Sequence, residues 1–384
     1  MPEYIAKTLF GMEKVVADEL RDIGMKEVNI LNRAVSFKGD KADLYRANIS
    51  SRTALKFLVP LAEAEINNER ELYEFVRTVR WDRYLDAKDT LAVETGLNTT
   101  LFNHSQFISQ KIKDAVVDQF REKSGVRPSV DLDNPTLRIN AYINGKNVKL
   151  SRDSSGDSLH RRGYRVRQGL APLNEVLAAC LVKISGWQPG KPLYDFMCGS
   201  GTIAIEAALM ALDILPGELR PQFGFMNWKD YDASLFNSML DHRKRNTKAG
   251  SAQIFASDLS PSAVQLAIRH SQNAGVSAAI KFKTCHFEDV EAVQGPGTII
   301  VNPPYGERIV QENLNDLYTQ IGNKFKKDFE GYEAWVLSGN AEAMKHIGLR
   351  PSPKVIVYNG QLECRFNRYL LYSGSKKTAK TQDS

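Results

Sequence analysis

Apolar and polar residues alternate along the first 152 residues in a pattern that predicts short strands and amphipathic helices. Residues 1–50 have the order strand, helix, two strands and helix, which predicts a small α+β domain. Residues 51–152 predict a second α+β unit that ends in a hairpin across Asn144-Gly145. The expected strands are 4–9, 27–31, 34–37, 55–65, 90–96, 136–143 and 147–151, and the expected helices are 13–23, 41–48, 69–79 and 105–123.

Strands and helices then alternate regularly from residue 193 to residue 337, which predicts a doubly wound parallel sheet. A last strand at 362–372 follows Pro351 and Pro353 without a crossover helix, so it is expected to pair antiparallel to its neighbour. The other expected strands end at residues 195, 258, 284, 301 and 337, and the expected helices are 173–184, opened by Pro172, then 203–212, 262–274 and 313–327. A further helix ends in the basic run 243–245, within an unusual segment at 211–250.

The stretch 193–202, LYDFMCGSGT, predicts the end of a buried strand, a glycine turn and the start of a helix. Such a unit presents backbone N–H groups and a helix N-terminus at the carboxyl edge of a parallel sheet. Gly199 and Gly201 allow a ligand to approach the main chain closely, and Asp195 lies at the strand end. The turn also fits the loose dinucleotide-binding pattern, and a packing turn without a ligand is the alternative.

A second signal is the apolar strand 298–301, which runs directly into Asn302-Pro303-Pro304-Tyr305-Gly306. Two prolines cannot continue a sheet, so the chain must turn there. The turn fixes an amide, a backbone carbonyl and an aromatic ring at the carboxyl end of another strand.

Together these two stretches resemble motifs I and IV of the class I S-adenosylmethionine-dependent amino-methyltransferases. The antiparallel closing strand also separates this class from the dinucleotide-dependent dehydrogenases. The resemblance implies a cofactor site made by Asp195, the turn Cys198, Gly199, Ser200, Gly201 and Thr202, and Asp258, whose carboxylate would accept the ribose hydroxyls. Asp258 comes sixty-three residues after Asp195, which requires 211–250 to be an excursion from the sheet. Asp289 would receive the adenine amino group, with a solvated helix cap as the alternative.

Motif IV implies the target. An exocyclic base amine is a poor nucleophile because its lone pair is delocalised into the ring. The Asn302 side chain and the Pro303 carbonyl can accept its N–H groups, Pro304 shapes the turn, and Tyr305 can stack on the base. No basic side chain is needed, because the proton leaves after methyl transfer.

Composition narrows the remaining possibilities. The 384 residues are 42% hydrophobic and 25% charged, which is ordinary for a globular protein of two or three domains. No apolar run is long enough to cross a membrane and no signal peptide begins the chain, so a cytoplasmic location is expected. The four cysteines are scattered and form no C-x-x-C pair, so neither a metal site nor a disulfide framework is expected. Cys198 is expected to be a small buried residue beside the turn, with a nucleophile as the alternative.

The net charge of +6 is compatible with nucleic acid as a partner. Residues 160–167, HRRGYRVR, combine arginines with a tyrosine, and such a run suits phosphate contact and base stacking. Arg161, Arg162, Tyr164 and Arg165 are therefore predicted to bind RNA, with a solvated linker as the alternative.

Residues 51–155 resemble a THUMP domain, an RNA-binding module, in their helix-rich middle, the D-L-D-N-P turn at 131–135 and the final hairpin. The whole of 1–373 resembles the THUMP-domain RNA guanine-N2 methyltransferases that act on large-subunit (23S) ribosomal RNA. The matching residues are RRGYR at 161–165, APLNE at 171–175, DFMCGSGT at 195–202, SD at 257–258 and NPPYGER at 302–308. The resemblance implies a ferredoxin-like domain at 1–50, a THUMP domain at 51–155, a Rossmann-like seven-stranded methyltransferase domain at 156–373 and a disordered tail at 374–384.

The expected function is therefore S-adenosylmethionine-dependent methylation of guanine N2 in ribosomal RNA. A transfer-RNA guanine-N2 methyltransferase shares almost all of these motifs. A DNA adenine-N6 methyltransferase shares the N-P-P-Y motif but leaves the first 150 residues unexplained. A non-catalytic RNA-binding assembly factor would have no reason to keep Asn302 and Tyr305. The nucleotide modified, the oligomeric state and the role of 211–250 stay open.

Overall fold

The computed structural model describes residues 1–166, 173–246, 250–305 and 311–372. Contacts within the chain divide it into two compact units, which are described separately. Unit 1 consists of 1–8, 16–161 and 220–246, and unit 2 consists of 9–15, 162–219 and 247–384. The predicted tail at 374–384, the glycine, glutamate and arginine at 306–308, and Pro172 lie outside the described residues.

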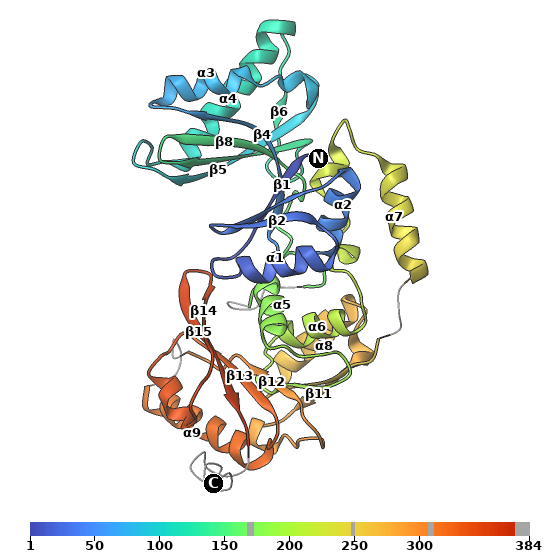
Figure 1. The fold of residues 1–384 in the computed structure, drawn as a ribbon, viewed down its shortest axis with the longest axis vertical. Helices are drawn as coiled ribbons and strands as arrows, with labels where there is room; N and C mark the ends of the chain where they lie inside the picture. Colours follow the sequence, from blue (N-terminus) through green and yellow to red (C-terminus); the bar gives the residue numbers. More distant parts are fainter. Residues whose placement is uncertain (167–172, 247–249, 306–310, 373–384) are drawn as a thin grey trace. The chain divides into compact units, whose positions relative to one another are not determined.

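Unit 1 is built on an eight-stranded sheet with the strand order β2-β3-β1-β4-β8-β7-β5-β6 (Figure 1). Its strands are β1 (Glu3–Lys7), β2 (Lys26–Leu31), β3 (Ala34–Lys38), β4 (Lys56–Glu65), β5 (Thr90–Asn98), β6 (Ser129–Val130), β7 (Leu137–Asn144) and β8 (Asn147–Asp153). Strand β4 pairs with β1 through Lys56, Phe57 and Leu58 and with β8 along most of its length. The two predicted α+β units therefore share one continuous sheet, with β4 as the common strand.

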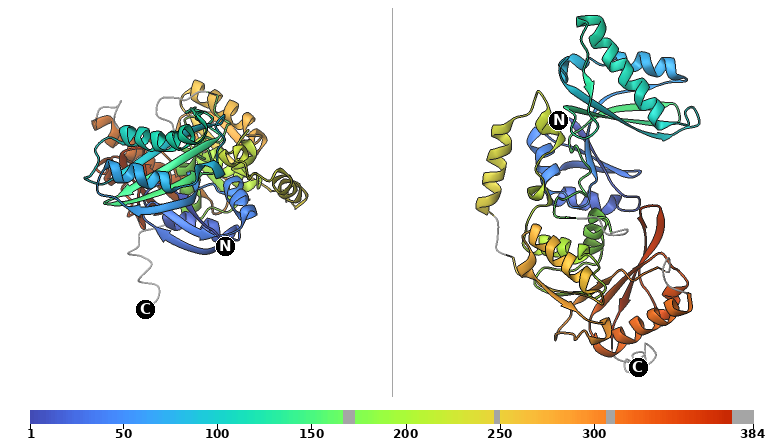
Figure 2. Two further views of the ribbon diagram at one scale, coloured as in Figure 1. Left: turned by 90° about the horizontal axis from the view of Figure 1, so that it is seen from above. Right: turned by 180° about the vertical axis from the view of Figure 1, so that it is seen from behind.

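The helices of unit 1 are α1 (Glu13–Asp22), α2 (Lys41–Ser50), α3 (Glu69–Thr78) and α4 (Ser105–Ser124). Helices α3 and α4 pack side by side on the part of the sheet that contains β5 (Figure 2). The acidic turn after β6 is held by Asp131, whose side chain accepts hydrogen bonds from the amides of Asp133 and Asn134. The turn therefore forms because an aspartate can satisfy backbone donors that no strand partner satisfies.

Residues 220–246 lie between two segments of unit 2 in the sequence, but they fold as part of unit 1. They include the short helix η3 (Gly224–Asn227) and helix α7 (Ala233–Asn246). The Phe225 ring stacks on Tyr45 of α2 with a centroid separation of 4.4 Å. The backbone of Gly224 lies so close to that of Gly156 that a side chain would not fit, since an added Cβ would be 2.8 Å from the Gly156 nitrogen. Of the excursion predicted for 211–250, residues 220–246 thus fold as part of unit 1.

The centre of this packing is Arg152 at the end of β8. Its guanidinium lies 3.9 Å from the Trp228 ring centroid and 4.7 Å from that of Tyr84, and it forms an ion pair with Asp230 at 3.1 Å. Cation–π contacts of this kind gain strength when they are shielded from water. Arg152 therefore connects the last strand of the sheet to the inserted segment.

We expect Trp228→Ala to lower the free energy of unfolding of unit 1 by about 3–5 kcal/mol, because it leaves a cavity and exposes Arg152. Asn237→Ala, on an exposed position of α7, should change it by less than about 0.5 kcal/mol. Urea unfolding measures the stability of both variants. Far-ultraviolet circular dichroism is the signal, because it does not depend on the tryptophan that is replaced. Equal stability of the two variants would mean that the segment only rests on the sheet.

Unit 2 contains a seven-stranded sheet with the strand order β11-β10-β9-β12-β13-β15-β14. The strands β9 (Pro192–Asp195), β10 (Gln253–Asp258), β11 (Ile280–Thr284), β12 (Thr298–Val301) and β13 (Glu333–Ser338) are parallel. Strand β15 (Leu362–Leu370) pairs antiparallel with both β13 and β14 (Lys354–Asn359). The predicted antiparallel closing strand is thus confirmed. The strand order reverses between β9 and β12, and ligands bind at such a reversal in sheets of this type.

The helices of unit 2 are α5 (Glu175–Ile184), α6 (Thr202–Ala211), α8 (Pro261–Asn273) and α9 (Gln311–Asp328). Helix α5 begins at Glu175 and not at residue 173, because the Asn174 side chain caps it by accepting hydrogen bonds from the amides of residues 176 and 177. Aromatic and aliphatic side chains of α9 pack against β9, β12 and β13 in a buried core that includes Tyr318 and Phe325. None of the helices in the described ranges has the length and hydropathy needed to cross a membrane.

Candidate functional site

Strand register brings the predicted site residues to one edge of the unit 2 sheet. Ala256 lies opposite Asp195, and Ile299 lies opposite Tyr194. The strand-end residues Asp195 and Asp258 and the Asn302 loop therefore follow neighbouring parallel strands at their carboxyl ends. This is the edge at which open α/β sheets bind ligands.

The glycine turn is fixed by backbone hydrogen bonds to the neighbouring strand. The Cys198 amide donates to the Ser257 carbonyl at 2.9 Å, and the Gly199 amide donates to Asp258 Oδ2 at 2.9 Å. Gly201, with φ of +80°, precedes α6, and a Cβ there would be 2.8 Å from the Ala267 Cβ. At Gly199, with φ of +52°, a Cβ would point into open space. Gly201 is thus needed for packing, whereas Gly199 leaves room for a ligand.

Asp195 is buried, with a relative exposure of 1%, and neither of its carboxylate oxygens has a well-aligned hydrogen bond among the described residues, although the nearby Met197 amide lowers its pKa in part. Burial raises the pKa of Asp195 well above its usual range, and the nearby Asp258 charge raises it further. A buried carboxylate without a partner is costly, and such groups are concentrated at sites that bind ligands. Asp195 therefore fits the role of an acceptor for a polar or cationic ligand group.

Cys198 lies beside these carboxylates. Burial raises the pKa of the Cys198 thiol well above its usual value, and the charges of Asp195 and Asp258 add to the effect. The thiol therefore stays protonated at neutral pH and is a poor nucleophile. Ser200 and Thr202 complete the turn, and the Thr202 hydroxyl accepts a hydrogen bond from Arg165 at 3.0 Å.

Asp258 and Asp289 occupy different surroundings. Asp258 Oδ1 accepts a hydrogen bond from the Ser260 amide at 2.9 Å, so both of its carboxylate oxygens are oriented by backbone amides. The next residue, Leu259, is 68% exposed and was not predicted as a site residue. Asp289 ends the short helix η5 (Phe287–Asp289) after β11 and is exposed. In the sequence, the only signal at Leu259 is a large apolar residue directly after a strand-end acid.

The Asn302–Tyr305 loop follows β12. The Tyr305 hydroxyl donates a hydrogen bond to Asn302 Oδ1. Burial raises the pKa of Tyr305, with the neighbouring Cys364 as the next cause, so the hydroxyl is a proton donor at every physiological pH. Since an amide oxygen has two lone pairs, Asn302 Oδ1 can accept a second donor. The Tyr305 ring is only partly exposed here, directed toward its own loop and Cys364.

The basic run at 160–167 requires a correction. The Arg162 and Tyr164 side chains are buried at 1% exposure and both contact Glu206 of α6. Buried side chains cannot contact phosphate or stack on a base, so the prediction that these two residues bind RNA is wrong for this structure. The Arg165 guanidinium is also held inside the unit, by the Leu173 carbonyl at 2.6 Å and the Thr202 hydroxyl.

Arg161 differs from these neighbours because its side chain is 63% exposed. Its contact with Asp157, at 3.5 Å, is a surface ion pair of little energetic weight. RNA binding by Arg161 stays a prediction.

We expect Arg162→Ala to lower the free energy of unfolding by about 3–5 kcal/mol, because it leaves the buried Glu206 charge without its cation. Arg161→Ala should change stability by less than about 0.5 kcal/mol. Thermal or urea unfolding of both variants checks this difference. A stable Arg162→Ala protein with weakened RNA binding would restore the original RNA-contact interpretation.

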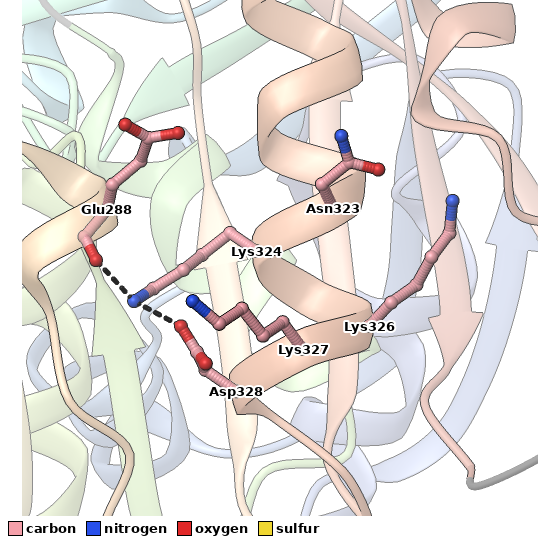
Figure 3. A pocket seen from close by; sticks show the side chains of 6 residues that line it. All are labelled: Glu288, Asn323, Lys324, Lys326, Lys327 and Asp328. Atoms are coloured by element: carbon pink, nitrogen blue, oxygen red, sulfur yellow. Dashed lines mark hydrogen bonds and ion pairs between the residues drawn. The ribbon is translucent and has the colours of Figure 1, made fainter.

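A surface hollow of about 500 Å³ lies elsewhere in unit 2, between α9 and η5 (Figure 3). Its lining is charged and polar: Glu288, Asn323, Lys324, Lys326, Lys327 and Asp328. Lys324 extends across it to donate to the Glu288 carbonyl at 2.6 Å and to pair with Asp328 at 2.6 Å (Figure 3). None of the predicted site residues lines this hollow, and the Lys324 contacts connect α9 to the segment that carries Asp289.

Among the described residues, no group of three or more histidine, cysteine or acidic side chains could hold a metal ion. The site instead combines an unpartnered buried carboxylate, open space at Gly199 and an oriented second carboxylate. These features fit a ligand with a cationic end and a hydroxyl-bearing middle, as S-adenosylmethionine has.

The sheet order, the antiparallel last strand and the glycine turn at the strand edge define a class I methyltransferase fold. The family described as "RMKL-like, methyltransferase domain" matches residues 162–368, and the chain belongs to this family. The THUMP domain family matches residues 67–153, and the RlmL ferredoxin-like domain family matches residues 3–58.

Two relatives illustrate the extent of the similarity. A Synechocystis protein, provisionally described as an RNA methyltransferase, is 41% identical over 96% of this chain and 97% of its own length. The ribosomal RNA large subunit methyltransferase K/L of Syntrophotalea carbinolica is 40% identical over 94% of this chain. The chain spans only 53% of the length of that K/L protein.

Solved structures resemble the whole chain. SMU.472, provisionally described as a methyltransferase and crystallised with SAH, is 25% identical, with a TM-score of 0.86 over 97% of this chain and 99% of its own. A Listeria monocytogenes protein named from its sequence as an N6-adenine-specific DNA methylase is 26% identical, with a TM-score of 0.84 over 96% of each chain. The fold and the domain order are thus shared along the full length.

Proposed function

We propose that this protein methylates an exocyclic base amine in RNA, with guanine N2 of large-subunit ribosomal RNA as the target and S-adenosylmethionine as the methyl donor. The observation that carries the proposal is that the predicted cofactor residues and the predicted target-base residues lie at the same carboxyl edge of the unit 2 sheet. Asp195 and Asp258 follow adjacent strands there, and Asn302 Oδ1 and the Pro303 carbonyl follow the strand on the other side. The domain boundaries at residues 50, 155 and 373 and a cytoplasmic location belong to the same proposal.

The cofactor supplies an electrophilic methyl group on a sulfonium centre, so the protein must hold and orient its reactants. In this proposal Asp195 accepts from the methionine end, while the Gly199–Thr202 turn presents its backbone there. Asp258 accepts from the ribose hydroxyls, and the exposed Leu259 covers one face of the adenine. Asp289 receives the adenine amino group. In this proposal the Asp195 carboxylate has a cationic group beside it only when the cofactor is bound.

The target amine would donate one N–H to Asn302 Oδ1 and the other to the Pro303 carbonyl. These two acceptors would favour a tetrahedral nitrogen and make its lone pair available for attack on the methyl group. The S–CH3 bond would break, the neutral thioether S-adenosylhomocysteine would leave, and the surplus N–H proton would pass to solvent. Tyr305 would stack on the base after its ring turns away from the loop. Burial raises the pKa of Cys198 and also that of Cys364 beside Tyr305, so neither thiol is activated as a nucleophile, and the proposal involves no covalent bond between enzyme and base.

RNA recruitment is assigned to unit 1, since the THUMP family match lies entirely within it. The net charge of +6 supports electrostatic attraction to phosphate, and Arg161 is an exposed arginine within the described part of the basic run. The name of the Syntrophotalea relative supports ribosomal RNA as the substrate class. Transfer RNA stays the alternative within the same chemistry.

A DNA adenine-N6 activity is the second candidate, because the Listeria structure carries that name and adenine N6 is also an exocyclic amine. The THUMP match favours RNA over DNA, since this module serves RNA-modifying enzymes. A non-catalytic assembly factor would not need the unpartnered carboxylate of Asp195, which costs stability without a ligand.

Incubation with methyl-labelled S-adenosylmethionine and, in parallel, ribosomal RNA, transfer RNA and genomic DNA tests the proposal. The ribosomal RNA is taken from cells that lack the enzyme, so that its target is unmethylated. We expect label in this ribosomal RNA and little label in transfer RNA or genomic DNA. Label in DNA alone would favour the adenine activity, and label in none of them would favour the assembly factor.

A further inference from the structure

The Asn302–Tyr305 loop depends on donors from outside itself. Neither Pro303 nor Pro304 has a backbone N–H group, so the loop can form few hydrogen bonds of its own. The Pro304 carbonyl accepts from the Tyr318 hydroxyl at 3.4 Å, and the Tyr305 carbonyl accepts from Asn340 Nδ2 at 3.4 Å. In the described part of the chain, no such donor reaches the carbonyl of Pro303, the residue directly before these two.

Tyr318 comes from α9, and its position is tightly fixed. The side chain is buried at 0% exposure, and its hydroxyl also shares a 2.6 Å hydrogen bond with Ser338 Oγ. Ser338 ends β13, the parallel neighbour of β12, and is itself buried at 1% exposure. The donor to the Pro304 carbonyl is therefore anchored both to a packed helix and to the adjacent strand.

Asn340 is fixed by a second set of contacts. Its amide nitrogen donates to Ser338 Oγ at 3.0 Å, and its side-chain oxygen accepts from the amides of Glu342 and Ala343. Its side-chain nitrogen is thereby directed at the Tyr305 carbonyl. Ser338 is common to both donors, so Tyr318, Ser338 and Asn340 form one connected group, which we call the loop brace.

We propose that Tyr318 and Asn340, joined through Ser338, are positioning residues that hold the Asn302–Tyr305 loop so that Asn302 Oδ1 and the Pro303 carbonyl face the target amine. The brace occupies the carbonyls of Pro304 and Tyr305 and leaves the Pro303 carbonyl for the substrate. This inference rests on the proposed function for the identity of the amine. The role of Tyr318 and Asn340 in holding the loop does not depend on the proposed function.

The chain offers a matched pair of variants. Tyr318→Phe removes one buried hydroxyl that donates to the loop. Tyr332→Phe removes one buried hydroxyl in the same unit that donates to the Val293 carbonyl at 2.7 Å, away from the loop. Both variants keep the aromatic ring and lose one buried hydroxyl together with its two partners, Pro304 and Ser338 for Tyr318 and Val293 and Tyr194 for Tyr332, so a purely structural effect should be similar in the two.

We expect Tyr318→Phe to lower kcat about tenfold with unchanged cofactor affinity and unchanged KM for RNA, because the loop loses order and not its binding groups. Asn340→Ala should act in the same direction, and the double variant should be less than additive because the two share Ser338. Tyr332→Phe should keep normal kcat. An unchanged kcat in Tyr318→Phe, or an equal loss in Tyr332→Phe, would overturn the inference.

Hydrogen–deuterium exchange gives a readout that needs no substrate. We expect faster exchange at the amides of Asn302 and Tyr305 in Tyr318→Phe than in wild type or Tyr332→Phe. Unchanged exchange there would overturn the brace even if the enzyme proved active. Conversely, faster exchange in a protein that transfers no methyl group to RNA or DNA would leave the brace intact and reject the proposed function.

Discussion

Replacing Asn302 by alanine should reduce turnover about 10²-fold or more while leaving S-adenosylmethionine affinity almost unchanged. The amide oxygen is a proposed acceptor for the reacting amine, and its interaction strengthens as the nitrogen gains positive charge. The cofactor turn follows a different strand and keeps its hydrogen bond from Gly199 to Asp258. Single-turnover kinetics and calorimetry measure the two quantities separately.

Asn323→Ala is a suitable control, because Asn323 is an exposed amide on α9 of the same unit. It should retain normal turnover. At Tyr305, the variant Tyr305→Phe should be mild if the ring stacks on the base, since it removes only the hydroxyl bound to Asn302. Tyr305→Ala should be severe. Normal turnover in Asn302→Ala would exclude this loop from the reaction.

The second large effect is expected at Asp195. Asp195→Asn should weaken cofactor binding about 10- to 100-fold, the equivalent of about 1–3 kcal/mol for losing a charged acceptor. The same change should stabilise the cofactor-free protein, because it removes a buried carboxylate that has no partner. Activity and stability would therefore change in opposite directions.

The pH dependence follows from the raised pKa of Asp195 in the folded state. Between the unfolded pKa, about 3.9, and the raised folded pKa, the folded state binds more protons than the unfolded state. Wild-type stability should therefore fall, relative to Asp195→Asn, as pH rises above about 4 and until the folded carboxyl ionises. Thermal unfolding of both proteins across pH 4–9, without cofactor, measures this difference.

The exposed Asp316 of α9 supplies the control, and Asp316→Asn should alter neither stability nor cofactor affinity. A destabilised Asp195→Asn protein that keeps wild-type affinity would identify Asp195 as a structural residue. Added S-adenosylmethionine should also stabilise wild type more than Asp195→Asn, since only binding to the folded state shifts the transition.

The parallel sheet and its edge were predictable because they depend on local signals. Apolar runs that end at Asp195, Asp258 and Val301 define strands, and the following glycines or prolines define where each strand stops. Since parallel strands end at the same edge, the strand ends suffice to bring these residues together. The two helix-rich units of the first half were predicted for the same reason.

The location of residues 220–246 was not predictable from local pattern. Its placement depends on Phe225 and Trp228 finding Tyr45 and Arg152, which are far away in the sequence. Nor does periodicity reveal that β4 joins two domains in one sheet, because a strand's sequence does not specify both neighbours.

The burial of Arg162 and Tyr164 was not predicted, because charged residues are usually exposed and the basic run was expected to be on the surface. One signal was available: Glu206 is the only charged residue in α6, whose sequence is TIAIEAALMA. An acid within an otherwise apolar, buried helix requires a cation nearby. Arg162 supplies that cation, with Tyr164 as a second contact.

The central claim is the chemical position of the transferred methyl group, and nucleoside analysis of the methylated RNA tests it most directly. RNA labelled by the wild-type enzyme is digested to nucleosides, which are separated and identified by mass, with Asn302→Ala as the inactive comparison. We expect the label in N2-methylguanosine from large-subunit ribosomal RNA. Label on a ring carbon or a ribose oxygen, or equal labelling by Asn302→Ala, would contradict the account.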